Sequence, residues 1–106
     1  MPENTHCIAC QPAAIPRDKR AEHQQLLRTI TFGKVLSAEE MQNGFALTYR
    51  AEDFLDLAKW VALERLCCPF VEFTLQTNSA GVKLQLTGPK GTKEYLLSIM
   101  PQAAGI

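Results

Sequence analysis

The pattern of apolar and polar positions predicts three helices. The first covers 16–30, where Pro16 is a favourable first-turn residue and the apolar side chains share one helical face. A second helix is expected to begin at Asp53 and to end near Cys68, because a proline follows and cannot continue it. A short closing helix is expected over 92–100. The expected apolar face of the second helix comprises Phe54, Leu57, Ala58, Val61 and Arg65, widened by Leu55, Ala62 and Leu66.

Strict alternation of apolar and polar residues predicts strands in two places. Residues 45–50 alternate directly after the turn signal Asn43-Gly44, so they form the second strand of a hairpin. The first strand of that hairpin is expected within 34–41, although the start of this segment could equally open a short helix. Residues 70–77 and 82–87 alternate on either side of a turn, which predicts a second hairpin.

The resulting order is helix, hairpin, helix, hairpin, helix. This order predicts an α+β fold of two layers, with helices on one face of a four-stranded, mainly antiparallel sheet. The chain has 106 residues, of which 46% are hydrophobic and 21% charged, so it is expected to form a single domain over 1–106. Residues 1–16 hold three of the six prolines and are expected to be an irregular arm.

Charge and hydropathy narrow the possible partners. The 11 basic residues balance the 11 acidic residues, so no nucleic-acid partner is expected. The chain has no run of about eighteen apolar residues and no secretory signal, so we expect no membrane span and a cytoplasmic location. In a reducing cytoplasm the four cysteines are expected to be thiols, metal ligands or redox groups in preference to structural disulfides.

The cysteines form two close groups, Cys7-x-x-Cys10 on the arm and Cys67-Cys68 at the end of the second helix. A Cys-x-x-Cys step lets two sulfurs reach one ion, and a second pair could complete a tetrahedral shell. Because neighbouring side chains diverge, three sulfurs with one further position fit the spacing equally well, and His6 is the candidate for that position. The pattern therefore predicts a soft-metal site for zinc, copper(I) or mercury(II).

Three interpretations of the cysteines stay open. In the first, the cysteines bind a soft metal ion and the protein is not an enzyme. The partial negative charge at a helix C-terminus favours this interpretation, because it stabilises a bound cation and destabilises a thiolate without metal. In the second, Cys67 or Cys68 is the nucleophile of a redox enzyme or sensor, with Cys10 as the resolving thiol. In the third, the cysteines pack in the core or hold a structural ion.

Other polar residues near the cysteines are candidates for supporting roles. Glu64 could orient or complete the site, although a single glutamate on a helix is more often solvated. Arg65 could offset the negative charge at the helix end. His23 is expected to be a partly exposed surface residue, and Trp60 is expected to belong to the core.

Three parts of the sequence resemble a small family of uncharacterised bacterial proteins, and the resemblance spans nearly the whole chain. They are Cys10, the stretch Glu64-Arg65-Leu66-Cys67-Cys68-Pro69-Phe70, and Leu86-Thr87-Gly88-Pro89-Lys90-Gly91-Thr92-Lys93. Similar sequences are often met near regulators of resistance to mercury or other metals, so the resemblance implies soft-metal handling. The family usually has a cysteine at the position of Cys10 and only sometimes at Cys7. The resemblance therefore implies a core of three sulfurs, from Cys10, Cys67 and Cys68.

Overall fold

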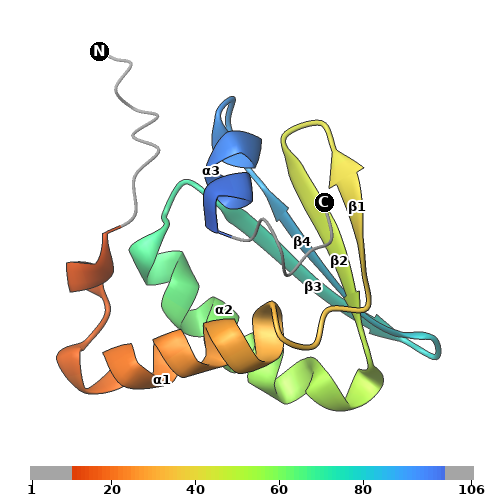
Figure 1. Cartoon of the computed structure of the whole chain (residues 1–106), viewed down its shortest axis with the longest axis horizontal. Helices are drawn as coiled ribbons and strands as arrows, with labels where there is room; N and C mark the ends of the chain where they lie inside the picture. Colours follow the sequence, from red (N-terminus) through yellow and green to blue (C-terminus); the bar gives the residue numbers. More distant parts are fainter. Residues whose placement is uncertain (1–10, 100–106) are drawn as a thin grey trace.

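The computed structural model describes residues 11–99, so the predicted ligands on the arm, His6, Cys7 and Cys10, lie outside the described residues. Its main elements are α1 (Arg20–Leu26), β1 (Ser37–Met41), β2 (Gly44–Tyr49), α2 (Phe54–Cys67), β3 (Glu72–Asn78), β4 (Gly81–Thr87) and α3 (Thr92–Ile99) (Figure 1). Short 3-10 turns precede α1 (Pro12–Ala14 and Arg17–Lys19) and α2 (Ala51–Asp53), and a π-helical turn (Leu27–Thr31) follows α1. The α+β class is confirmed.

All four strands form one antiparallel sheet in the order β1-β2-β4-β3. The two predicted hairpins are confirmed, and because β1 is a strand, the alternative of a short helix in this segment is wrong. Gly44 pairs with Met41 in one hairpin and with Thr87 of β4 on its other side. A Cβ atom at Gly44 would lie 1.8 Å from the carbonyl oxygen of Leu86, so this close approach of two strands requires glycine.

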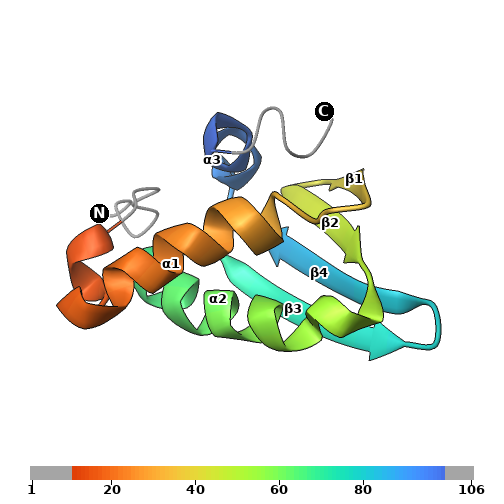
Figure 2. The ribbon, with the colours of Figure 1, turned by 60° about the horizontal axis from the view of Figure 1, so that its bottom comes forward.

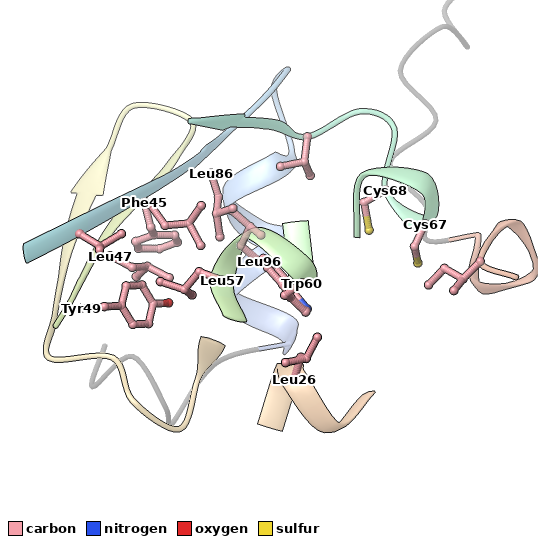
Figure 3. Packing of buried hydrophobic residues seen from close by; sticks show 14 residues of the cluster. Leu26, Phe45, Leu47, Tyr49, Leu57, Trp60, Cys67, Cys68, Leu86 and Leu96 are labelled. Atoms are coloured by element: carbon pink, nitrogen blue, oxygen red, sulfur yellow. The ribbon is translucent and has the colours of Figure 1, made fainter. Parts of the chain in front are cut away.

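One face of the sheet supplies most of the apolar core. Residues at alternate positions of the two central strands are fully buried, as the period of a strand requires: Phe45, Leu47, Tyr49, Val82, Leu84 and Leu86. Phe45 pairs across the strands with Leu86, and Leu47 pairs with Leu84. Leu57 and Trp60 of α2 and Leu96 of α3 complete this cluster, whereas the two cysteines lie at one end of it (Figure 3).

The buried face of α2 differs from the predicted one. Its buried residues are Leu57, Trp60, Glu64 and Cys67, which follow one another at helical spacing. Leu55 is 70% exposed and the side chain of Arg65 also lies in solvent, so their predicted place on the apolar face is wrong. Apolar residues occur nearly all around this helix, so their spacing alone does not define which side packs inward.

Trp60 connects α2 to its neighbours. Its ring lies parallel to that of His23 on α1, with 6.5 Å between centroids, and meets Phe73 of β3 edge-on at 6.0 Å. Figures 1 and 2 show α1 and α2 side by side, in agreement with their contacts. Within the described range, no helix has both the length and the apolar character needed to cross a bilayer.

Candidate functional site

The site forms where α2 ends. Cys67 is the last helical residue, and Cys68 leaves the helix with φ −123° and ψ 75°, because the following Pro69 disfavours a helical conformation before it. The Cys68 amide still donates a hydrogen bond to the carbonyl oxygen of Glu64, at 2.7 Å. This bond holds Cys68 against the last turn of α2, and both cysteine side chains are buried.

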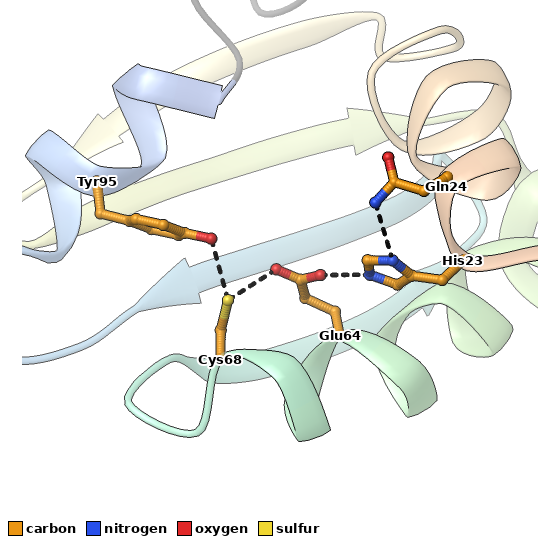
Figure 4. A network of polar contacts seen from close by, with 5 residues as sticks. All are labelled: His23, Gln24, Glu64, Cys68 and Tyr95. Carbon is orange, nitrogen blue, oxygen red and sulfur yellow. Dashed lines mark hydrogen bonds and ion pairs between the residues drawn. The ribbon is translucent and has the colours of Figure 1, made fainter. Parts of the chain in front are cut away.

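Five polar residues from three helices and the α2 exit form a connected series (Figure 4). It is here called the buried polar chain after its three buried central members, His23, Glu64 and Cys68, whereas Gln24 at one end is exposed and Tyr95 at the other is half-buried. Glu64 is at its centre: Oε1 lies 2.6 Å from His23 Nε2, and Oε2 accepts a hydrogen bond from Cys68 Sγ at 3.1 Å. Tyr95 Oη lies 3.1 Å from the same sulfur, and Gln24 Nε2 lies 3.5 Å from His23 Nδ1. Since the one S–H of Cys68 points to Glu64, the Tyr95 hydroxyl donates to the sulfur.

The surroundings of Cys68 keep its sulfur protonated. Burial is the main cause that raises the pKa of the thiol from 9.0 to about 12. The hydrogen bond from Tyr95 opposes this rise, whereas the negative charge of Glu64 and the hydrogen bond to it add to the rise. The pKa of Tyr95 is also raised, first by its own burial and then by Cys68. At neutral pH Cys68 is therefore a thiol and a weak nucleophile until something removes its proton.

Three potential ligand atoms converge at this place. A carboxylate oxygen of Glu64 and the sulfurs of Cys67 and Cys68 all lie within 4.8 Å of one another, and all three residues are buried. Two sulfurs that bind one tetrahedral ion at ~2.3 Å are themselves about 3.8 Å apart, so small side-chain movements suffice to close a shell. Neighbouring cysteines were expected to diverge, yet both sulfurs here are near one point. Two sulfurs and one oxygen form a donor set suited to soft or borderline ions.

Cys67 is disulfide-bonded. The sequence predicts thiols in preference to disulfides, so this bond differs from the expectation. The described part of the predicted arm reaches the site, because the amide of Gln11 donates a hydrogen bond to the carbonyl oxygen of Cys67 at 2.7 Å. The residue before Gln11 is Cys10. Convergence of the arm cysteines and His6 on the site stays a prediction.

A cavity of about 360 Å³ lies beside the buried polar chain. Its wall is mainly apolar, with Ile15, Leu27 and Ile99 contributed by the start of the described chain, the π-helical turn and α3. Cys67, Glu64 and His23 also line it, so the cavity and the potential ligand atoms share residues. The volume falls in the range of small-molecule sites, about 300–1,000 Å³.

Comparison with models of known protein families, with curated proteins and with solved structures finds no match for this chain. The resemblance seen in the sequence therefore stays a prediction. Function has to be argued from the geometry and chemistry of the site.

Two members of the buried polar chain were not recognised as buried from the sequence. His23 is 5% exposed, so its expected place on the surface is wrong. A signal was present, because His23 lies three and four positions before Leu26 and Leu27 and so shares their helical face. Glu64 is also 5% exposed and fits the supporting role considered for it in place of the solvated one. Arg65 lies in solvent, on another side of α2.

Proposed function

We propose that this protein binds a soft metal ion, zinc, copper(I) or mercury(II), through the thiolates of Cys67 and Cys68, in cytoplasmic metal handling or resistance. The observation that supports this proposal is the convergence of two sulfurs and the Glu64 carboxylate within 4.8 Å. Thiolate ligands select soft ions over magnesium and calcium. Burial of all three ligand atoms also excludes competing water.

The arm supplies the remaining ligand in this proposal. Cys10 is the third sulfur, and Cys7 and His6 are auxiliary. The hydrogen bond between Gln11 and Cys67 supports this assignment, since it holds the residue after Cys10 against the site. If the arm supplies a ligand, metal binding and docking of the arm are thermodynamically coupled, so each favours the other.

Glu64 and His23 assist binding by placing a carboxylate acceptor beside the Cys68 thiol. A metal–sulfur bond at Cys68 displaces one proton, and Glu64 Oε2 already accepts a hydrogen bond from that S–H. The other carboxylate oxygen of Glu64, Oε1, is in turn held by His23. This contact would keep the buried carboxylate beside the sulfur once the thiol proton has left the site.

Cys67 can act as a ligand only after its disulfide is reduced. Reduction consumes two electrons and two protons, which a dithiol reductant supplies while it is itself oxidised to a disulfide. The proposal therefore predicts that the reduced protein binds the ion and that the oxidised protein does not. The redox state of Cys67 would decide when the protein takes up metal.

Metal titration of the reduced full-length chain under anaerobic conditions tests the proposal. We expect about one equivalent of zinc, copper(I) or mercury(II) in competition with a chelator, and a loss of affinity of at least about tenfold in Cys67→Ser and Cys68→Ser. Cys10→Ser should weaken binding more than Cys7→Ser, which is the matched control on the arm. A reduced protein that takes up none of the three ions would overturn the proposal.

The disulfide at Cys67 supports a second candidate, thiol–disulfide exchange. In that reaction a substrate thiolate attacks the Cys67 sulfur, a mixed disulfide forms, and the partner sulfur leaves as a thiolate that takes up a proton. The raised pKa of Cys68 disfavours this residue as the attacking group. Turnover in a disulfide-reduction assay, lost in Cys67→Ser and retained after chelation, would favour exchange over metal binding.

A further inference from the structure

We propose, on the basis of the metal-binding function above, that the ion taken by this site carries one carbon-bonded apolar substituent. The probe of this class is an organomercury(II) cation, R–Hg⁺. The Cys67 thiol, once reduced, binds the mercury and loses its proton, and the group R occupies the cavity of about 360 Å³ that Cys67 lines. The R–Hg bond stays intact in this step, and the proton leaves to Glu64 or to water.

The size of the cavity carries the argument. A bare ion needs only ligand atoms at ~2.3 Å from it. The three potential ligand atoms already lie close enough together to bind one ion. The adjoining cavity has the volume of a small-molecule site and no use in holding a bare ion. Space of this kind next to the ligand atoms fits an ion that brings an organic group with it.

The lining fits an apolar group in particular. Ile15, Leu27 and Ile99 form a wall of aliphatic carbon. Cys67 and Glu64 belong to both the cavity lining and the set of potential ligands, so a substituent on a metal bound to Cys67 has direct access to this wall. Removal of the substituent from water adds a favourable term of about 25 cal/mol per Å² that a bare ion lacks.

The charge of Arg20, which also lines the cavity, is compatible with this ligand. Its guanidinium donates hydrogen bonds to the carbonyl oxygens of Ile15, at 3.0 Å, and Ala13, at 3.3 Å, and so secures the segment that forms one wall. Capture of R–Hg⁺ by a thiolate gives a neutral R–Hg–S unit. A neutral unit is not repelled by the positive charge of Arg20.

Competition binding on the reduced full-length chain tests the inference with phenylmercury, methylmercury and Hg²⁺, each against a small free thiol. The thiol competitor cancels the intrinsic mercury–sulfur affinity, so the remaining difference reports the substituent. We expect phenylmercury to exceed methylmercury by about tenfold, the effect of burying a few more ring carbons. Leu27→Phe and Ile99→Phe fill the cavity and should remove that preference while the binding of Hg²⁺ changes less than about twofold.

Leu55→Phe is the matched control, because Leu55 is 70% exposed and does not line the cavity. Circular dichroism shows whether each variant is folded. Because the cavity is filled from two separate positions, the test can still be made if one of the two variants does not fold. Equal binding of phenylmercury and methylmercury by the wild type would overturn the inference and leave the metal-binding proposal intact. Failure to bind any of the three mercury probes would also overturn the inference, and the metal-binding proposal falls with it only if zinc and copper(I) do not bind either.

Discussion

The imidazole Nε2 of His23 and the carboxylate Oε1 of Glu64 lie 2.6 Å apart, although 41 positions separate the two residues in the sequence. Both side chains are buried, so each satisfies a polar group that would otherwise be costly to remove from water. The pair joins α1 to α2. It also ties the position of α1 to the carboxylate that contacts Cys68.

Removal of the Glu64 carboxylate should therefore destabilise the protein. In Glu64→Ala both His23 and the Cys68 thiol lose their contact with this buried group, and we expect the free energy of unfolding to fall by about 2–4 kcal/mol. Glu64→Gln keeps the shape and one acceptor oxygen, so its loss should be smaller. Urea unfolding near neutral pH measures both, and a double-mutant cycle with His23→Gln should give a coupling of about 1 kcal/mol or more. Strictly additive effects would show that the contact has no energetic role.

The inward face of α2 can be tested with two leucines on the same helix. Leu57 is fully buried and Leu55 is 70% exposed. Leu57→Ala should lower the free energy of unfolding by about 2–5 kcal/mol, because it removes core contacts and leaves a cavity. Leu55→Ala should change it by less than about 0.5 kcal/mol in the same urea titration. Similar losses in the two variants would mean that α2 packs with a different face.

The sheet was predictable because alternation along a strand sets its buried face directly. The apolar positions of β2 and β4, such as Leu47 and Leu84, point inward as their period requires, and turn signals divide the strands into hairpins. The buried face of α2 was harder to predict, because apolar residues occur nearly all around the helix and only tertiary packing decides which of them point inward. Leu55 was assigned inward for this reason and lies in solvent.

The site was only partly predictable. Cys67 and Cys68 were identified from the chemistry of their side chains. Their polar partners could not be identified from spacing, since His23 and Tyr95 meet Cys68 and Glu64 only through the packing of α1 and α3 against α2. A histidine and a glutamate are exposed on most helices, and a buried pair of them arises from a tertiary contact that a local pattern does not contain.

The raised pKa of Cys68 predicts an unusual dependence of its alkylation on pH. An ordinary thiol, with a pKa of 9.0, reaches half of its full rate of reaction with iodoacetamide at pH 9.0 and nearly all of it by about pH 10. With a pKa near 12, Cys68 should react very slowly near neutral pH, and its rate should still rise about tenfold between about pH 10 and pH 11. Peptide mapping by mass spectrometry, on protein whose Cys67 disulfide is intact, follows this residue separately.

Variants of the two residues that contact the Cys68 thiol, Glu64 and Tyr95, should shift its alkylation rate along the pH axis in opposite directions. Glu64→Gln removes a negative charge that raises the pKa of Cys68, so its alkylation should begin at lower pH. Tyr95→Phe removes the hydrogen bond that lowers this pKa, so its alkylation should begin at higher pH. A Cys68 rate that is already constant above about pH 10 in the wild type would contradict the assignment.

The same shift links stability to alkaline pH. A thiol whose pKa is higher in the folded protein than in the unfolded chain holds its proton more tightly in the folded state. Its contribution is fully present below pH 9.0 and is lost as the pH rises toward 12. Urea unfolding at a series of pH values should show this fall, and Cys68→Ala should make it shallower. If the free energy of unfolding falls equally steeply with pH in Cys68→Ala, other groups cause the fall, such as Tyr49, whose pKa is also raised by burial.

The stacking of Trp60 on His23 has a practical consequence. Trp60 is the single tryptophan of the chain, and its indole ring lies against an imidazole that is hydrogen-bonded to Glu64. Indole emission responds to neighbouring charge and to heavy atoms. The protein therefore carries its own optical reporter, linked to the Cys68 sulfur through His23 and Glu64, and binding of the proposed ion should change its fluorescence without a label.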